Sequence, residues 1–453
     1  MRRRSFLHTM LSSTSLVGLG SAHAQPSTVA SGNPPAGSGN LPAGSGNPPA
    51  GSGNPPAGSG NKLVVVMLRG AVDGLSVVAP FSEPSYREAR STLALAAPGT
   101  ADDALLPLDR QFGLHPSLAR LHGFWLRGQL GFVHASGSPD PTRSHFDAQD
   151  YLETGTPGRK STPDGWMNRL LAQMQGPSGS TRAVNMGATP ARILAGSATV
   201  ASLGLGARAF DAKAVDDPRM RRALARLYGD AGALGRTFQE TTESRSAMNL
   251  SMAAASERSR ASGEGMDNGR SSDPSADNGA PTARGFAADA RRLGQLLQAD
   301  PNLQLAFSSV GGWDTHVNQG GARGQLANRL ASLAEGLESL VQGLDAAYSR
   351  TVIVLMSEFG RTVRQNGTGG TDHGRGNVMC LLGGPVAGGR VLGVWPGLDR
   401  SALVEGRDLD VTTDFRAVLA PVLQQHLGVD DAALARIFPD FTGATFPFDL
   451  VRA

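Results

Sequence analysis

The stretch LVVVMLRGAVDG (residues 63–74) runs from an apolar segment directly into an acid, and this junction decides the fold. A run of large apolar residues without alternation is typical of a strand covered on both faces. Because strands of an open α/β sheet deliver functional residues at their carboxyl ends, we predict one polar site along one edge of a sheet. Three later runs also end beside residues that bind metals or move protons: Leu130–Ala135 before Pro141–Asp150, Leu303–Val310 before Asp314 and His316, and Thr351–Met356 before Glu358.

Helical patterns separate these strands. This alternation predicts an α/β fold with a mostly parallel central sheet and helices on both faces. Val378–Leu382 and Arg390–Val394 are expected as later strands, and Asp414 as the N-cap of a final helix through Leu427. The expected helices before it are Pro116–Arg127, Ser144–Thr154, Phe286–Gln298 and Gly324–Leu344.

Composition narrows the classes of function. The chain has 453 residues, enough for a large core, and its formal charge of +3 falls to zero without Arg2, Arg3 and Arg4. A neutral mature chain gives no electrostatic reason to expect nucleic acid or an anionic membrane as partner. No apolar stretch in the mature region is long enough to span a bilayer. The single cysteine, Cys380, excludes an intrachain disulfide and is expected to be a small core residue.

Residues 1–24 have the pattern of a bacterial export signal. Basic residues precede a mildly apolar segment, Phe6–Gly20, and Ala22-His23-Ala24 provides a small-x-small cleavage site. The run RRSFL (3–7) resembles a twin-arginine signal, which predicts the twin-arginine translocase as a partner during export. The alternative is an ordinary Sec signal with an extra arginine. Both routes predict a periplasmic or secreted protein.

Two segments have the composition of flexible chain. Residues 25–61 form a linker in which the unit SGNPPAG recurs from Ser31 to Asn61, and the proline in every unit predicts a tether. Residues 244–282, rich in Ser, Ala, Gly, Asp and Arg, are expected to be a flexible insertion within a single domain, 62–453. A domain boundary is the alternative, but ligand-type residues lie on both sides of the segment.

Acids and a histidine follow two of the predicted strands. Asp73, within RGAVDG, could bind a cation, although an Asp-Gly pair also forms turns. Asp314 and His316 lie two residues apart, so in an extended segment their side chains project the same way. One carboxylate and one imidazole so placed can share a divalent ion. The alternative is a capped turn with an incidental histidine.

Two further clusters follow the strand Thr351–Met356. Glu358 and Arg361 could form a surface ion pair, or a metal ligand beside an anion-binding guanidinium. Asp372 and His373 lie in the glycine-rich loop GGTDHG (369–374), which a bound metal would order. The alternative for that loop is a mobile surface turn.

Hydroxyls, an arginine and a histidine gather before the expected helix at Ser144. Ser144 and Asp147 form an S-x-x-D pair, which is close to a capping box. A hydroxyl at a helix N-terminus is also well placed to meet an anionic ester. Ser144 or Thr142 is therefore a cap or a nucleophile, with Arg143 and His145 beside it to hold the substrate.

These motifs resemble the DUF1501 family of exported bacterial proteins. That family is grouped with the alkaline phosphatase and sulfatase superfamily, so the resemblance implies an alkaline-phosphatase-like α/β fold with a one- or two-metal hydrolytic site. The resemblance covers essentially everything from Lys62 to the C-terminus. The matching strings are LRGAVDGL (68–75), FGLHPSLARL (112–121), HASGSPDPTRSHFDAQDYLETGTPG (134–158), GGWDTH (311–316), SEFGRTVRQNGTGGTDHGRGN (357–377) and VTTDFRAVL (411–419).

The resemblance assigns roles to residues of this chain and also shows one departure. It implies Ser144 or Thr142 as nucleophile, with Arg143 or Arg361 holding the transferred group. Phe359 stands where the superfamily has a second histidine ligand, so either Asp372 substitutes for that ligand or one metal site is incomplete. The implied metal ligands are Asp73, Asp314, His316, Glu358, Asp372 and His373.

Two functions follow from this sequence. The first is an exported hydrolase of phosphate or sulfate esters that uses zinc, calcium or magnesium, in one or two ions, to activate a Ser or Thr hydroxyl. Its substrate would be a small anionic ester. The second is a non-catalytic protein of the cell envelope that binds a glycan, an anionic polymer or another protein, since a fold does not fix a function.

Overall fold

The computed structural model describes residues 60–174, 181–187, 189–206, 217–228, 232, 246, 280–443 and 446–452. These residues all belong to one compact unit, Pro55–Ala453. The predicted signal at 1–24 lies outside the described residues. So do nearly all of the linker at 25–61 and nearly all of the insertion at 244–282.

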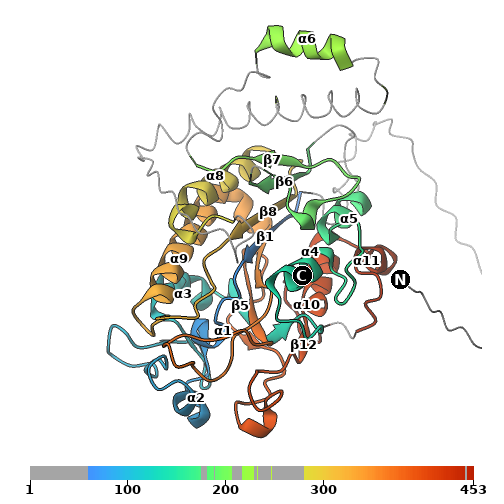
Figure 1. Ribbon diagram of the computed structural model, residues 1–453. Coiled ribbons are helices and arrows are strands. Elements are labelled where there is room, and N and C mark those ends of the chain that lie inside the picture. The colour runs from blue at the N-terminus through green and yellow to red at the C-terminus, as the bar shows by residue number, and fades with distance from the viewer. Residues whose placement is uncertain are drawn as a thin grey trace, which may run out of the picture. The chain divides into compact units, whose positions relative to one another are not determined.

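A nine-stranded sheet lies at the centre of the described unit (Figure 1). Its strands follow the order β11-β5-β10-β9-β1-β8-β6-β7, with β12 pairing with β5. Its strands are β1 Lys62–Leu68, β5 Leu130–Gly137, β6 Ala183–Met186, β7 Ala201–Leu203, β8 Leu305–Val310, β9 Thr351–Ser357, β10 Asn377–Gly383, β11 Val391–Leu392 and β12 Thr413–Asp414. A smaller sheet joins β2 Val78–Ala79, β4 Gly113–Leu114 and β3 Leu106–Pro107.

Strand β1 is central because its apolar run can be buried on both faces. Every residue of β1 is buried, and the strand pairs in parallel with β8 on one side and β9 on the other. Val64 and Val66 belong to one hydrophobic core, whereas Leu63 and Val65 belong to the other. This alternation follows the two-residue period of a strand. The predicted role of the opening run is confirmed.

Strand β10 is the exception in a sheet that is otherwise parallel. It runs antiparallel to both β9 and β5, while all other neighbours pair in parallel. Because β9 ends at Ser357 and β10 starts at Asn377, the loop between them stays at the carboxyl edge of the parallel strands. The antiparallel strand thus keeps residues 358–376 beside the other strand ends.

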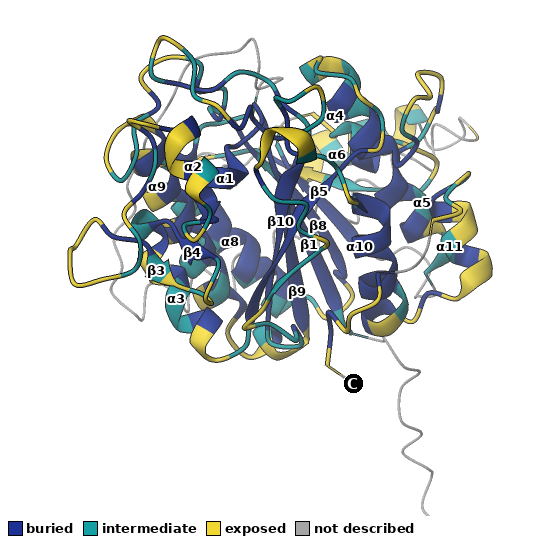
Figure 2. Ribbon diagram, turned by 90° about the horizontal axis from the view of Figure 1, so that it is seen from below, coloured by how far each residue is buried: buried dark blue, intermediate teal, exposed yellow. Residues whose placement is uncertain are grey.

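Helices cover both faces of the sheet, as predicted (Figure 2). One core packs α3, α8 and α9 against the sheet, and the other packs α5, α10 and α11 against the opposite face. The helices are α1 Gly74–Val77, α2 Pro84–Ala89, α3 Ala119–Leu126, α4 His145–Thr154, α5 Trp166–Gln173, α6 Pro218–Tyr228, α8 Phe286–Ala299, α9 Gln325–Leu344, α10 Phe415–Pro421 and α11 Asp431–Ile437.

The carboxyl-terminal helix differs from the prediction. Asp414 does cap α10, accepting a hydrogen bond from the backbone of Arg416 at 2.9 Å. The helical backbone continues through a π-helical segment, Val422–His426, to Leu427, the predicted end, and α11 then follows it. The predicted cap and extent of this helix are therefore confirmed, and only its position as the last helix was wrong. Among the described residues, no helix has both the length and the hydrophobicity needed to cross a membrane.

Candidate metal centre

The carboxyl ends of three parallel strands bring the candidate site together. Asp314 and His316 follow β8, and His373 lies in the loop that connects β9 to β10. His145 is the first residue of α4, after β5. These four residues meet although as many as 228 positions separate His145 from His373 in the chain.

The Nε2 atoms of three histidines converge on one carboxylate. His373 Nε2 lies 3.0 Å from His145 Nε2 and 2.9 Å from His316 Nε2. The carboxylate oxygens of Asp314 lie 3.0 Å from His316 Nε2, 3.3 Å from His373 Nε2 and 3.7 Å from His145 Nε2. Ligand atoms held by one zinc ion at about 2.0–2.1 Å in a tetrahedron lie about 3.3 Å apart. The spacing fits a single metal ion.

The other ring nitrogen of each histidine already has an acceptor. His145 Nδ1 lies 2.8 Å from a carboxylate oxygen of Glu358, and His373 Nδ1 lies 3.0 Å from the backbone oxygen of Arg143. A carboxylate and a carbonyl only accept hydrogen bonds, so both Nδ1 atoms donate. Metal-binding histidines almost always have such a partner on the second nitrogen.

His316 repeats this arrangement at the rim of the site. Its Nδ1 lies 3.0 Å from a carboxylate oxygen of Asp372. A neutral imidazole carries one proton, so once Nδ1 donates, Nε2 carries a lone pair. Three lone pairs and one carboxylate this close together repel each other unless a cation lies between them. The donor set therefore fits a metal ion.

The charges at the site also favour a cation. Burial opposes protonation of His145, but hydrogen bonds to Asp314 and Glu358 raise its pKa to about 9. Burial would raise the pKa of Asp314, but its partners His145 and His373 and the Arg361 guanidinium hold that pKa well below its usual range. Without a metal, the cluster therefore binds a proton tightly.

Glu358 lies behind the histidines rather than among the converging atoms. Its side chain is fully buried and accepts hydrogen bonds from the backbone of Gly70 at 2.8 Å, from Gln149 at 2.9 Å and from Ser357 at 3.0 Å. It also accepts the Nδ1 proton of His145. The structure thus assigns Glu358 to orienting His145, in place of the ligand role expected from its position.

Asp372 likewise lies behind a histidine. Its carboxylate accepts from Asn366 at 3.0 Å, and this bond, with that to His316, lowers the pKa of Asp372. Asn366 also donates to the backbone oxygen of His316 at 2.8 Å and accepts from Gly370. Hydrogen bonds to Asn366 and His316 therefore hold the glycine-rich loop in this conformation.

Phe359 forms an apolar wall of the site. It is 4% exposed, and its ring centroid lies 4.9 Å from that of His145 and 5.0 Å from that of His373. The phenyl ring offers no ligand atom, so the residue that departs from the superfamily pattern supports two imidazoles by packing against them.

Asp73 lies apart from the cluster. It is fully buried, and both carboxylate oxygens accept from Arg90, at 2.5 and 2.9 Å. Ser76 and Gln319 also donate to it, each at 2.7 Å. Burial raises the pKa of Asp73, but Arg90 overcomes this and lowers it. Because these donors occupy its lone pairs, Asp73 forms a buried ion pair and hydrogen bonds within the core. The expected metal-ligand role is corrected.

The two predicted anion-binding arginines are committed to other partners. The Arg361 guanidinium is buried and donates to the backbone oxygens of Ala71 and Gly70, at 2.6 and 2.5 Å, and to Asp314 at 2.5 Å. The Arg143 guanidinium donates to Asp408 at 2.6 Å and to Glu405 at 3.1 Å. Arg361 therefore fixes Asp314, and Arg143 fixes a neighbouring loop.

One of the two predicted hydroxyls caps the helix that carries His145, and the other supports the turn before it. Ser144 is the N-cap of α4, and its Oγ accepts from the backbone of Asp147 at 3.5 Å. Thr142 Oγ1 accepts from the backbone of Ser144 at 3.2 Å. The capping interpretation of Ser144 is confirmed, and its exposed position beside His145 leaves the hydroxyl accessible to a substrate.

Sequence reasoning missed the ligand geometry of His145 and the residues behind the site. His145 was expected to contact substrate, but one of its ring nitrogens belongs to a group in which the ligand atoms of His145, Asp314 and His373 all lie within 4.8 Å of one another. Gln149, one helical turn later, also contacts Glu358. The spacing of His145 and Gln149 on one face of the predicted helix was the available signal.

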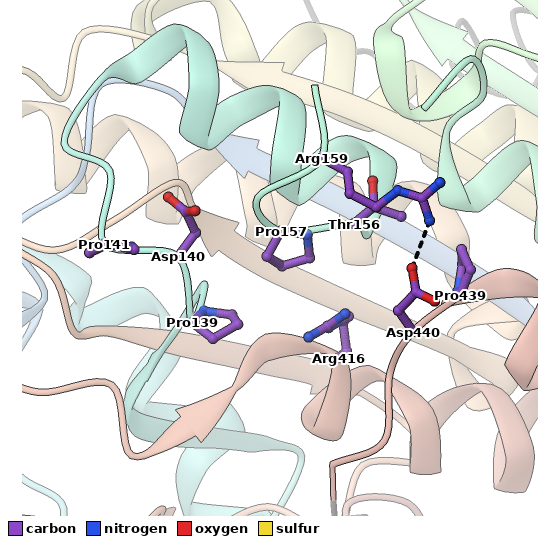
Figure 3. A pocket seen from close by; sticks show the side chains of 9 residues that line it. All are labelled: Pro139, Asp140, Pro141, Thr156, Pro157, Arg159, Arg416, Pro439 and Asp440. Carbon is purple, nitrogen blue, oxygen red and sulfur yellow. Dashed lines mark hydrogen bonds and ion pairs between the residues drawn. The ribbon is translucent and has the colours of Figure 1, made fainter. Parts of the chain in front are cut away.

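A separate polar cavity of about 330 Å³ lies beside the loop that leads into α4 (Figure 3). Three of its four charged lining residues form ion pairs. Arg159 bonds Asp440 at 2.6 Å and Arg416 bonds Asp414 at 2.6 Å. None of the converging histidines lines this cavity, so it is distinct from the candidate metal centre.

Comparison with protein families gives one match. The family described as "Protein of unknown function (DUF1501)" matches residues 113–438. This range contains His145, Asp314, His316 and His373. No curated protein matches the chain.

Several solved structures are similar in fold. A protein in the alkaline phosphatase superfamily from Vibrio parahaemolyticus is 11% identical, with a TM-score of 0.36, over 85% of this chain and 70% of that one. The C-terminal periplasmic domain of EcEptC from Escherichia coli is 11% identical, with a TM-score of 0.37, over 85% and 88%. The alkaline phosphatase from the Antarctic bacterium TAB5 is 10% identical, with a TM-score of 0.28, over 73% and 93%. At these scores the similarity carries no argument about the site.

Proposed function

Because the chain belongs to the DUF1501 family, whose description names no activity, we propose a function from the site itself: a metal-dependent hydrolase of phosphate or sulfate esters. One observation carries the proposal. The Nε2 atoms of His145, His316 and His373 converge on Asp314 while each Nδ1 has its own acceptor. This is the donor arrangement of a metal site in which the outer hydrogen bonds fix each ring.

The donor set favours zinc over the other two metals. Calcium and magnesium prefer oxygen ligands, whereas imidazole suits zinc and other transition metals. His145, His373 and Asp314 supply three ligands, and His316 stands at a more exposed position, 37% accessible at its side chain. Histidines combined with one carboxylate are a ligand set that zinc adopts in proteins. We propose one ion per chain.

The residues around this centre would bind the anionic group and supply the nucleophile. When bound, the metal would polarise the ester and neutralise charge that develops on it. Helix α4 begins at His145, so the positive end of its dipole favours an anionic group at the same place. The nucleophile would be the hydroxyl of Ser144 or of Thr142. With Arg143 and Arg361 engaged elsewhere, the helix terminus takes the anion-holding role expected of them.

The site of action is proposed from the amino-terminal sequence. The pattern of residues 1–24 supports export through the twin-arginine translocase, and hence a periplasmic or secreted enzyme that acts on a small anionic ester. Export in the folded state would allow the metal to be bound before the chain leaves the cytoplasm.

Elemental analysis combined with ester hydrolysis tests the proposal. Purified protein should carry about one zinc per chain and hydrolyse p-nitrophenyl phosphate or p-nitrophenyl sulfate, and Asp314→Ala and His373→Ala should lose both properties. Glu335→Gln, on the exposed face of α9, is the matched control and should keep them. Protein that neither binds nor is stabilised by any divalent metal would exclude the proposal. Metal binding without turnover on any ester would favour the non-catalytic envelope protein instead.

A further inference from the structure

Two exposed apolar side chains directly follow histidines of the metal centre. Phe146 follows His145 and is 70% exposed, and Val317 follows His316 and is 51% exposed. Isolated apolar residues at a surface are ordinary. These two differ in position, because only five large apolar side chains among the described residues are at least 51% exposed, and two of the five adjoin the centre.

The centre brings the two histidines that precede these residues to a common point. His145 and His316 both reach His373, at 3.0 and 2.9 Å between Nε2 atoms, although they come from α4 and from the loop after β8. Phe146 and Val317 are therefore carried by different elements to the surroundings of the same point. Neither belongs to any of the hydrophobic cores.

The local backbone holds both residues in place. Phe146 is the second residue of α4, where side chains lean toward the amino end of the helix, which is the end at the metal centre. The backbone oxygen of Val317 accepts from Gln325 at 3.0 Å, and the next residue, Asn318, bonds Thr368 at 3.0 Å. Ordered apolar surface beside a polar centre is positioned to bind an apolar part of a ligand.

We propose that Phe146 and Val317 bind the apolar leaving group of the ester, so that the preferred substrate joins a phosphate or sulfate to an alkyl or aryl group. This inference rests on the proposed hydrolase function. The anionic end would be held at the centre and the start of α4, while the two side chains shield the apolar end from water. Burying that surface favours such substrates over small polar ones.

Matched substrates and variants test the inference. Methyl phosphate and hexyl phosphate have the same charge and similar leaving groups, so they differ in apolar surface. Phe146→Ser should lower kcat/KM for hexyl phosphate about tenfold, mainly through KM, and leave methyl phosphate nearly unchanged. Val317→Ser should act in the same direction by a smaller factor. A phenyl phosphate arm distinguishes an aryl-binding from an alkyl-binding surface.

The control is Leu126→Ser. Leu126 is 73% exposed but lies four residues before β5, at the opposite edge of the sheet, and its replacement should leave both substrates unaffected. Equal effects of Phe146→Ser on methyl and hexyl phosphate, or none on either, would overturn the inference while leaving hydrolysis intact.

Calorimetry keeps the two proposals separable. Hexylphosphonate should bind the zinc-loaded protein more tightly than methylphosphonate, and Phe146→Ser should remove the difference. If the protein hydrolyses no ester, the proposed function fails, but this difference in binding still decides whether the surface recognises apolar groups. Equal binding of the two phosphonates by the unmodified protein would reject the surface as well.

Discussion

Two aspartates at the same edge of the sheet have opposite surroundings. Asp73 follows β1 and Asp314 follows β8, and the two strands are parallel neighbours. Asp73 is fully buried, and Arg90 pairs with both of its oxygens. Asp314 is 26% exposed at its side chain and meets three imidazoles in addition to Arg361.

The difference shows that the partner decides what a carboxylate at a strand end can do. A guanidinium is charged at every accessible pH, so Arg90 balances Asp73 and leaves no need for an ion. Imidazoles can be neutral, and those around Asp314 present lone pairs. The Asp73 carboxylate is therefore neutralised within the core, whereas the Asp314 carboxylate can bind a cation.

The largest effect on stability should come from breaking the ion pair between Arg90 and Asp73. Arg90→Met leaves the Asp73 carboxylate buried without its counter-ion, which should lower the free energy of unfolding by about 3–5 kcal/mol. Urea denaturation measures the change. Zinc affinity of the folded variant, measured by competition with a chelator, should stay within a factor of about three of the original, because Arg90 contacts none of the converging atoms.

The double variant Asp73→Leu, Arg90→Met separates loss of a charge partner from loss of packing. Replacing both ions by apolar side chains removes the uncompensated charge, so most of the lost stability should return. A double variant as unstable as Arg90→Met alone would contradict the charge-balance explanation.

Zinc should stabilise the folded protein only through the cluster of Asp314 and the three histidines. At a free zinc concentration 100 times Kd, binding to the folded state alone raises the free energy of unfolding by about 2.7 kcal/mol. His373→Ala should abolish this increment in thermal unfolding followed with and without zinc. His122→Ala removes a histidine that bonds only the backbone oxygen of Pro107, and it should keep the full increment. An increment that survives in His373→Ala would place the ion elsewhere.

The fold could be predicted because its determinants are local. The buried strands β1, β8 and β9 are short apolar runs. Each run alone predicts a strand that is buried on both faces. The convergence of Asp314, His316 and His373 also followed, since parallel strands place their carboxyl ends together.

The roles within the site could not be predicted in the same way. Whether an acid binds a metal or stands behind a ligand depends on contacts of a few ångströms between distant segments. Glu358 and His145 are 213 residues apart, and their roles are the reverse of those expected. His145 offers the ligand atom, and Glu358 accepts the hydrogen bond that orients it. Arg90, which decides the role of Asp73, lies in no recognised motif, so nothing in the sequence marked it.

Glu358→Gln tests that reversed relation. The amide keeps the size of the side chain but removes the charge that accepts the Nδ1 proton of His145, so zinc affinity should fall about 10–100-fold. Chelator competition measures the affinity, and Glu335→Gln on the surface of α9 controls for the loss of one acid. If Glu358 were itself a ligand, the loss should be as complete as in His373→Ala.

The smallest effect should come from the apolar wall. Phe359→Leu removes ring contacts with His145 and His373, and such contacts are worth about 0.5–1.5 kcal/mol, so the free energy of unfolding should fall by about 1 kcal/mol. Zinc affinity should fall less than tenfold, because both imidazoles keep their hydrogen bonds to Glu358 and to the backbone of Arg143. Phe307→Leu, in the core beneath the sheet, provides the comparison: it should lower stability and leave zinc affinity unchanged. A larger loss of zinc affinity in Phe359→Leu than in Glu358→Gln would mean that packing, rather than the carboxylate, fixes the imidazoles. The contrast between Asp73 and Asp314 would then depend more on packing than on charge.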